Sequence, residues 1–433
     1  MHRFIFLFFI AVSVVSCKKD FIPDGDAIDE NAFMNPENLK VLIVGGLEWE
    51  DPYLESFSKH HRKDAELEQT FLNLGVATEN IISLYDEENT LESMYAAFDS
   101  IAVMSDAETH FIFYFSGHGF PGYNYINDHE SIYFANYDIN SWYPESTGFN
   151  IDYIGDEFIN KFKGNAVLFM ADCCMSGGLI EQAQKFSNKG IKAAAVTSSA
   201  ASNWSTGNWT FTQKVIDALN GDRYINLNGD REITYAEMIS EINFSMRNNE
   251  RQKYGASFFN WSTEEVIVKT NNKKNTLDTE NFYNGQYVFA KHKKNYYPVQ
   301  ITGEKNEMLQ CRFYNYADYE NWTVDTDSIK IPYYVEYNIG DIVNIESFKE
   351  KTATIEATED GFYKVVEVGG TGTLWLTYER LSNGTEQPVT ILNENGNWVP
   401  GKILATDADA YFITYDDRNF QWDEWVNADR VEF

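Results

Sequence analysis

Two stretches of sequence decide the fold of this chain: FIFYFSGHG at residues 111–119 and AVLFMADCCMSGG at residues 166–178. Each begins as a short apolar run of aromatic, branched or small residues, which is typical of a buried strand. Each then reaches a chemically reactive side chain, His118 between two glycines in the first stretch and Cys174 shortly before two glycines in the second. We therefore expect two buried strands that carry a histidine and a cysteine just past their carboxyl ends.

The surrounding sequence predicts the rest of an α/β domain. Further strand-like runs lie at residues 40–46, 81–84 and 193–196, and segments with helical spacing separate them. Asn89 with Glu92, for example, favours a capped helix start. Strands that alternate with helices favour a mostly parallel sheet covered on both faces. Since ligands bind at the carboxyl edge of such sheets, His118 and Cys174 are expected to meet there.

A histidine beside a cysteine suits the hydrolysis of amide bonds, which requires a thiolate, a base and donors for the oxyanion. His118 supplies the base for Cys174. The N–H groups of Gly119 and Cys174 are the expected oxyanion donors, because glycine lets the backbone approach a substrate closely. No third catalytic side chain is apparent, so a Cys–His dyad is the simpler hypothesis. Taken singly, the histidine fits a turn and the cysteine fits a core; their pairing favours catalysis.

The two stretches resemble the histidine and cysteine motifs of metacaspases and other caspase-like peptidases. In that clan the histidine lies roughly 50 residues before the cysteine, as it does here. Residues 63–65 (Lys-Asp-Ala) and 207–212 (Gly-Asn-Trp-Thr-Phe-Thr) are similar to two further segments of the family. The resemblance covers residues 39–269. It implies a caspase-like α/β fold and a cysteine endopeptidase that acts on proteins or peptides.

The family motif runs Asp, a small residue or Cys, the nucleophile, a variable residue, Ser and Gly. The resemblance therefore places the nucleophile at Cys174 and leaves Cys173 as a packing residue. Met175 stands where many relatives carry histidine, which is a modest departure. The Gln-Ala-Cys-x-Gly signature of caspases proper is absent from the sequence, so cleavage after aspartate is not supported.

The resemblance also implies a pocket for the residue before the scissile bond. In metacaspases, acidic residues at the positions of Asp64 and Asp172 line this pocket, and Ser116 would lie beside them. Two carboxylates favour arginine or lysine through charge and bidentate hydrogen bonds. The alternative for Asp64 is an ordinary helix N-cap.

The N-terminus predicts export. A basic start, Met1 to Arg3, precedes an apolar run at residues 4–15 that is too short to span a bilayer. The run ends at Ser16-Cys17 and resembles a bacterial lipobox, which implies cleavage before Cys17 and lipidation of that cysteine. We expect a signal peptide at residues 1–16, a tether at residues 17–38, and an exported lipoprotein at the outer membrane or cell surface. A plain secretory signal or membrane anchor is the alternative.

The last third of the chain has a different character. Residues 270–284 are polar and predict a linker, and alternating apolar and polar residues then indicate β structure. The pattern repeats with a period of roughly 50 residues, at 285–332, 333–384 and 385–433. These units resemble small SH3-like or Tudor-like barrels, whose aromatic residues fill cores or form cages for methylated side chains. They define the alternative function, a catalytically inert caspase-like surface protein that binds through its barrels.

Charge and ligand-type residues limit the partners. The formal net charge of −32 disfavours nucleic acid and anionic membranes, so we expect membrane contact through a lipid anchor only. The four cysteines fit no zinc motif, and we expect no metal site. Residues 226–237 depart from a calcium loop at Asn226 and Arg231, and predict a polar turn before a helix. No cofactor is required, although the resemblance allows Ca²⁺ as an activator.

Overall fold

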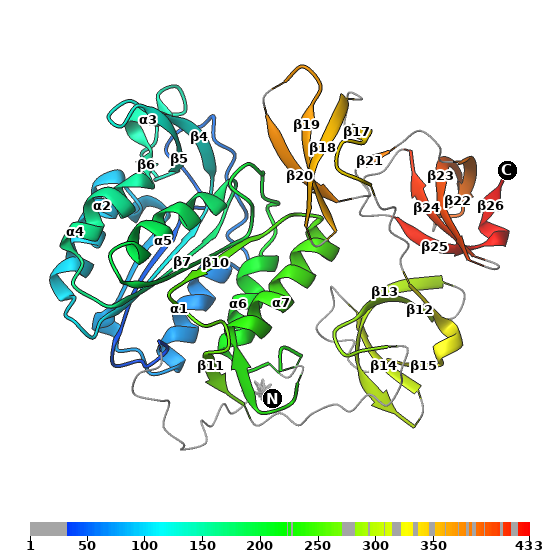
Figure 1. Cartoon of the computed structure of the whole chain (residues 1–433), viewed down its shortest axis with the longest axis horizontal. Helices are drawn as coiled ribbons and strands as arrows, with labels where there is room; N and C mark the ends of the chain where they lie inside the picture. The colour runs from blue at the N-terminus through cyan, green and yellow to red at the C-terminus, as the bar shows by residue number, and fades with distance from the viewer. Residues whose placement is uncertain are drawn as a thin grey trace, which may run out of the picture.

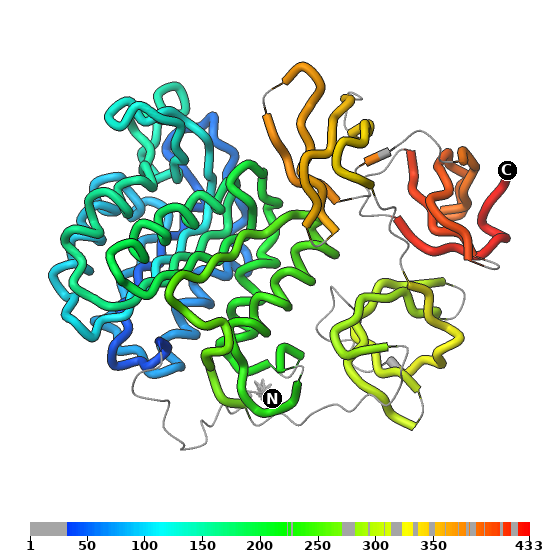
Figure 2. The backbone as a smooth tube through the Cα atoms, in the orientation of Figure 1, coloured from blue at the N-terminus to red at the C-terminus, as the bar shows by residue number. Residues whose placement is uncertain are grey.

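The computed structural model describes residues 33–433 except for short gaps at residues 223, 227, 271–281, 293–294, 307, 314–321, 332–336, 346–350, 360, 371, 378–380, 383–386, 394, 408–409 and 417–422. Figures 1 and 2 show an α/β part followed by three small β-sheets. In the part of the chain that the structure describes, no helix is long and apolar enough to cross a membrane. The predicted signal peptide and the lipidation of Cys17 fall outside the described residues.

A six-stranded sheet forms the centre of the α/β part, with the strand order β10-β8-β7-β3-β1-β2. Its strands are β1 (Leu39–Gly45), β2 (Ile81–Tyr85), β3 (His110–Ser116), β7 (Ala166–Asp172), β8 (Lys192–Thr197) and β10 (Gly255–Phe259). All neighbours are parallel except β10, which runs antiparallel to β8. The central strands are buried almost throughout, as a parallel sheet covered on both faces requires. The predicted α/β class is confirmed.

Alternate side chains of the central strands enter two separate cores. Val41 of β1 packs in the core under one set of helices, and its neighbour Leu42 packs in the core on the opposite face. The first core is covered by α1 (Lys63–Asn73), α6 (Thr210–Leu219) and α7 (Tyr235–Ser245), the second by α2 (Leu91–Met104) and α5 (Leu179–Ser187) (Figure 1). Because burying one large apolar side chain contributes about 1.5–3 kcal/mol, these two cores hold the sheet rigidly.

Smaller elements complete the α/β part. They are η1 (Thr78–Asn80), η2 (Asp86–Glu88), β4 (Gly119–Asn124), β5 (His129–Phe134), α3 (Pro144–Thr147), β6 (Phe149–Asn150), η3 (Ile154–Phe158), α4 (Ile159–Lys161), η4 (Ser176–Gly178), β9 (Glu232–Thr234), η5 (Met246–Glu250) and β11 (Val266–Lys269). Strands β4, β5 and β6 form a small sheet that begins immediately after His118.

Two predictions about helix starts have different outcomes. The cap of α2 is Thr90, whose hydroxyl accepts a hydrogen bond from the Ser93 N–H at 3.1 Å, so the prediction of Asn89 was wrong by one residue. Asn89 is instead fully buried, and its side chain points toward the Ala135 carbonyl. The polar turn before α7 is present, and Thr234 with Glu237 forms a capping box there.

Among the described residues, no cluster of three or more acidic, histidine or cysteine side chains could hold a metal ion.

The C-terminal part consists of three five-stranded antiparallel sheets that share one strand order. They contain β12 (Tyr287–His292), β13 (Asn295–Lys305), β14 (Met308–Phe313), β15 (Trp322–Val324) and β16 (Ile329–Lys330); β17 (Ile342–Ile345), β18 (Lys351–Glu359), β19 (Phe362–Glu367), β20 (Thr373–Thr377) and β21 (Leu381–Ser382); and β22 (Gln387–Leu392), β23 (Trp398–Asp407), β24 (Ala410–Tyr415), β25 (Glu424–Asn427) and β26 (Val431–Glu432). In each sheet the fourth strand is at one edge and the fifth strand pairs with the first.

A repeated irregularity shows how closely the three sheets correspond. The second strand of each sheet shifts register just after an isoleucine, at Ile301, Ile355 and Ile403. A bulge at this position bends the long strand and increases its twist. The C-terminal part is thus built from strands, as expected. The likeness of the three units to SH3-like or Tudor-like barrels stays a prediction.

Candidate active site

The predicted site residues lie along one edge of the central sheet. Strand pairing places Gly45 beside Ser116, and Ser116 beside Asp172, at the carboxyl ends of β1, β3 and β7. His118 follows β3 by two residues, and Cys174 follows β7 by two residues. The fold therefore brings both reactive side chains to the same edge, because parallel neighbours end on the same side of a sheet.

The two adjacent cysteines have different environments. Cys173 is 2% exposed and packs in the core, where burial raises the pKa of its thiol well above the usual value. Cys174 is half-buried, and the backbone N–H of Ser205 donates a hydrogen bond to its Sγ at 3.2 Å. Burial raises the pKa of Cys174 as well, but the Ser205 N–H opposes the shift because it stabilises a thiolate. Met175 then adopts a left-handed conformation (φ 57°) that turns the chain into η4.

His118 is held from one side by the segment that follows β1. The rings of Trp49 and Phe57 lie against the imidazole, each with its centroid 4.5 Å away. Nε2 of His118 lies 2.9 Å from the backbone carbonyl of Glu55. A carbonyl only accepts hydrogen bonds, so Nε2 carries the proton and Nδ1 keeps a free lone pair. Burial lowers the pKa of His118, which favours this neutral, basic form.

The Glu55 carbonyl therefore lies where it can orient the His118 ring, a contact that the sequence did not reveal. In serine and cysteine hydrolases a third group orients the imidazole and selects its tautomer. Here the contact is made by a backbone atom, and no side-chain pattern could have signalled it. In the described part of the chain no hydrogen bond joins His118 to Cys174. Such contacts are often long before a substrate binds.

The two predicted oxyanion donors lie on backbones in direct contact. A Cβ atom added to Gly119 would come within 2.1 Å of the Cys174 carbonyl oxygen. Only glycine allows this approach, because any side chain would separate β4 from the loop after β7. The contact holds the Gly119 and Cys174 main chains together beside the thiol.

The predicted pocket residues are connected but differ in accessibility. Asp64 is fully buried, its Oδ2 accepts a 3.3 Å hydrogen bond from Ser116 Oγ, and Arg62 pairs with it. Asp172 accepts hydrogen bonds from the hydroxyl of Thr212 at 2.6 Å and from its N–H at 3.3 Å. Burial raises the pKa of Asp172 to about 6, although the Thr212 hydrogen bonds oppose the shift. Thr212 belongs to the Phe-Thr segment at residues 207–212. The hydrogen bonds from Thr212 connect this segment to Asp172.

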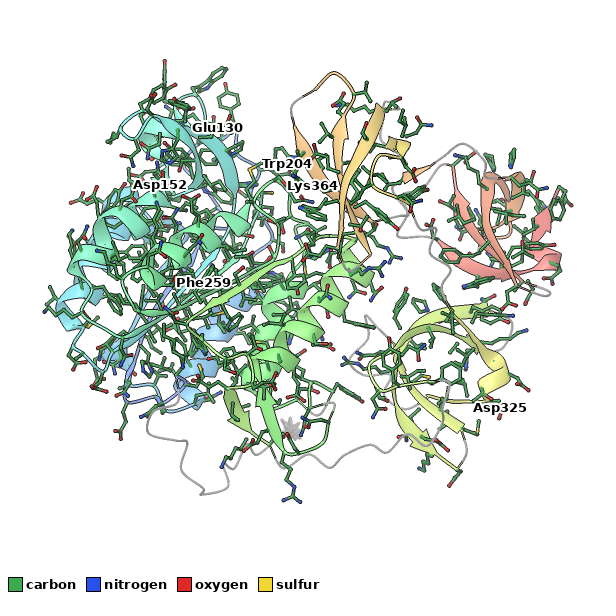
Figure 3. All side chains as sticks on the ribbon, in the orientation of Figure 1. Glu130, Asp152, Trp204, Phe259, Asp325 and Lys364 are labelled. Carbon is green, nitrogen blue, oxygen red and sulfur yellow. The ribbon has the colours of Figure 1, made fainter. Side chains whose placement is uncertain are left out.

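Loops around the thiol connect it to the C-terminal sheets. Asn203, two residues before Ser205, uses its amide to bond both backbone groups of Trp375 in β20, at 2.8 and 3.1 Å. Figure 3 shows the neighbouring Trp204, which is 67% exposed, at the place where the α/β part meets the second sheet. The residues that line a groove of about 670 Å³ include Gly177, Gly178 and Trp375.

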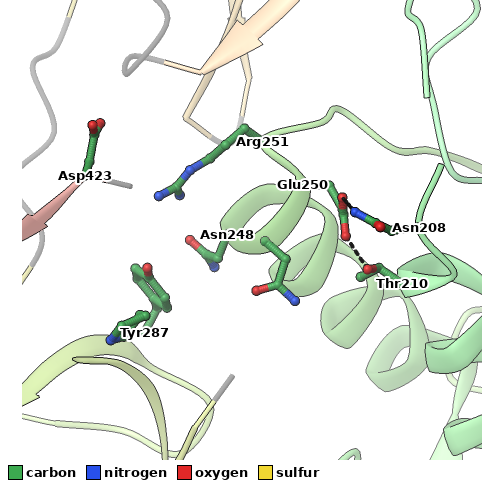
Figure 4. Close-up of a pocket in the computed structure, with 9 residues that line it drawn as sticks. Asn208, Thr210, Asn248, Glu250, Arg251, Tyr287 and Asp423 are labelled. Atoms are coloured by element: carbon green, nitrogen blue, oxygen red, sulfur yellow. Dashed lines mark hydrogen bonds between the residues drawn. The ribbon is translucent and has the colours of Figure 1, made fainter. Parts of the chain in front are cut away.

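A separate polar cavity of about 430 Å³ lies between the α/β part and the C-terminal sheets (Figure 4). Glu250 accepts hydrogen bonds there from Asn208, at 3.0 Å, and from the Thr210 hydroxyl. Gln252, two residues further on, accepts from the Thr206 N–H at 2.8 Å and donates to the Ser205 hydroxyl at 3.1 Å. This network supports the loop that carries the thiol's hydrogen-bond donor.

Comparisons with known proteins identify the family to which the chain belongs. The family model of the caspase domain (Peptidase C14) matches residues 58–276, and the chain belongs to this family of cysteine peptidases, whose substrates are proteins. A search of curated proteins found no significant match.

A search of solved structures matched, among others, a protein from Geobacter sulfurreducens, with 14% identity and a TM-score of 0.38, covering 54% of this chain and 97% of that one. The search also matched caspase-1 from Spodoptera frugiperda, with 12% identity and a TM-score of 0.33, covering 57% of this chain and 89% of that one.

Proposed function

We propose that this chain is a cysteine endopeptidase in which Cys174 is the nucleophile and His118 the base, and that it cleaves after arginine or lysine. The observation that carries the proposal is the orientation of His118. Its Nε2 lies at hydrogen-bond distance from the Glu55 carbonyl, so Nδ1 keeps a lone pair for a proton. Cys174 follows the neighbouring strand β7 by two residues at the same edge of the sheet.

The reaction then follows from ordinary thiol chemistry. Nδ1 of His118 takes the proton from the Cys174 thiol, and the thiolate attacks the carbonyl carbon of the scissile bond. The N–H groups of Gly119 and Cys174 stabilise the oxyanion. His118 returns the proton to the leaving amine, and water hydrolyses the thioester with His118 again as the base.

The basic preference rests on the carboxylates beside Ser116. Asp172 stands next to Ser116 in the sheet register, two residues before the nucleophile. When ionised, its carboxylate attracts a cationic side chain of the residue before the scissile bond. Asp64, which is bonded to Ser116 Oγ, is the second carboxylate of this pocket.

The test uses the full chain and its Cys174→Ala variant with fluorogenic peptides that end in Arg, Lys, Asp or Leu, with and without calcium. Cleavage after Arg or Lys by the parent chain alone supports the proposal, and dependence on calcium would define the activator. Cleavage that survives in Cys174→Ala would overturn it. An absence of cleavage under every condition would favour the inert binding protein.

We also propose that the chain is an exported lipoprotein anchored through Cys17. Mass spectrometry of the mature N-terminal peptide tests this, because a diacylated or triacylated cysteine at position 17 gives a defined mass increase. An unmodified peptide that still carries residues 1–16 would contradict it.

A further inference from the structure

Arg62 makes the hydrogen bonds that a substrate's arginine would need. Its Nε donates to Asp64 Oδ1 at 2.8 Å and its Nη2 donates to Asp64 Oδ2 at 2.7 Å, which is the paired geometry of arginine on a carboxylate. Its Nη1 donates to Asp86 at 2.8 Å, and Nη2 also reaches the Gly45 carbonyl at 3.2 Å. The guanidinium lies 4.7 Å from the centre of the Tyr85 ring. Two carboxylates, a carbonyl and an aromatic face form a complete arginine cradle.

Asp64 has no remaining capacity for a second bidentate partner while Arg62 is in place. Its Oδ1 accepts from Arg62 and from the N–H of Ala65 at 2.8 Å. Its Oδ2 accepts from Arg62 and from Ser116 Oγ. The carboxylate is fully buried, whereas the side chain of Arg62 remains 18% exposed. Arg62 therefore covers the carboxylate from solvent and neutralises its charge.

The position of this ion pair connects it to the candidate pocket. Asp64 is bonded to Arg62 on one side and to Ser116 on the other, and Ser116 lies beside Asp172 in the sheet. The close approach is possible because residue 45 is glycine: an added Cβ would lie 1.9 Å from Asp64 Oδ2. The carboxylate that is proposed to bind a basic side chain of the substrate thus already binds Arg62 of the same chain.

We propose that Arg62 is an internal occupant of the acidic pocket, which limits the affinity of the free enzyme for a substrate arginine. This inference rests on the proposed peptidase function. With Arg62 seated, an incoming arginine meets Asp172 as the carboxylate of the predicted pocket that Arg62 does not bind. Full recognition by two carboxylates requires Arg62 to release Asp64.

Kinetics on matched peptides tests the proposal. Arg62→Gln removes the positive charge but keeps an amide that donates to Asp64, which limits the cost of leaving this buried carboxylate unpaired. We expect kcat/KM for an arginine peptide to rise about tenfold relative to the same peptide with leucine, mainly through KM. Asp86→Asn loosens the second anchor of Arg62 and should act in the same direction by a smaller factor. An unchanged or reduced Arg/Leu ratio in both variants would overturn the proposal.

Lys59→Gln is the matched control. Lys59 pairs with Asp86 at 3.0 Å and with Glu48 at 2.6 Å, but it makes no ion pair with Asp64 in the described structure. Its loss removes a neighbouring positive charge without freeing the pocket carboxylate. The Arg/Leu ratio should therefore stay within about twofold of the parent value, and an equal rise in this control would attribute the effect to net charge instead.

A binding measurement separates this inference from the peptidase proposal. Benzamidine, an arginine mimic, is titrated calorimetrically into Cys174→Ala and into Cys174→Ala with Arg62→Gln. Tighter binding to the second protein, by about tenfold, supports the occupant role even when no peptide is cleaved. Equal affinities overturn it even when the enzyme is active. Folding of each variant is checked by its thermal transition, and Arg62→Lys, which keeps the charge but loses the paired geometry, should fall between the two.

Discussion

The histidine and cysteine halves of the candidate site stand on neighbouring strands but are supported in different ways. His118 is oriented by Trp49, Phe57 and the Glu55 carbonyl, all from one local segment after β1. Cys174 is contacted by Ser205, whose loop is bonded to Trp375 through Asn203 and to Gln252. The contacts of the proposed base are thus local to the α/β part. The environment of the proposed nucleophile depends on distant parts of the chain, including the second C-terminal sheet.

The largest expected effect separates the two cysteines. Cys174→Ala should lower kcat/KM by at least about 10³-fold, because the nucleophile is lost. Cys173→Ala should change activity by less than about tenfold and cost about 1 kcal/mol of stability, since it removes only one small buried group. Peptide hydrolysis and thermal melts of both variants check this. The opposite ranking would move the nucleophile to Cys173.

The next effect concerns the local support of the histidine. Phe57→Ala removes one of the two rings against the imidazole and should lower kcat by about tenfold with little change in KM, because the base is misplaced and not removed. His118→Gln sets the upper limit at about 10²–10⁴-fold. If Phe57→Ala is as fast as the parent enzyme, the segment after β1 does not position the base.

The third effect is a pH dependence that belongs to the pocket. The pKa of Asp172 is raised to about 6, so its carboxylate is ionised above that pH. The ratio of kcat/KM for arginine peptides to kcat/KM for leucine peptides should fall up to about tenfold per pH unit below 6, and Asp172→Asn should remove this dependence. Leucine peptides assayed over the same pH range provide the control. A ratio for the parent enzyme that is flat through pH 6 would contradict a role for Asp172.

The pH dependence of thermal stability is a second, independent measurement of the ionisation of Asp172. An acid whose pKa is raised on folding contributes stability that is present below its unfolded pKa and lost as the pH rises through its folded pKa. For Asp172 this window runs from about 3.8 to about 6. Asp172→Asn, which still accepts from Thr212, should therefore raise Tm by a few degrees (~3 °C) at pH 8 and progressively less toward pH 4.

The smallest effect tests the distant support of the cysteine. Asn203→Ala removes the two hydrogen bonds to Trp375, each contributing about 1 kcal/mol. We expect a change of up to about threefold in the rate of thiol alkylation by iodoacetamide, with thermal melts confirming that the variant folds. Phe57→Ala should change that rate less than Asn203→Ala does, because no hydrogen bond joins His118 to Cys174 in the described part of the free enzyme. Equal responses of the thiol to both variants would remove the distinction between the two halves.

Residue pattern predicted much of this arrangement for a physical reason. Buried parallel strands must be continuously apolar, and a reactive residue just after such a strand must lie at the carboxyl edge, so 111–119 and 166–178 could be placed before any contact was known. The alternation and spacing of the last third likewise indicated repeated β units. Helix caps were less certain, because Asn89 and Thr90 are both good capping residues and only the backbone angles select Thr90.

By itself, the sequence determined the α/β class, the strand ends that carry His118 and Cys174, and the β character of the C-terminal part, since all of these follow from hydrophobic periodicity and from the residues that interrupt it. Only the tertiary structure decided which groups contact His118 and Cys174. The Glu55 carbonyl and the Ser205 N–H are backbone groups, which every residue possesses and no sequence pattern marks. The pairing of Arg62 with Asp64 also depends on the fold, because the same two residues in an exposed helix start would simply be solvated.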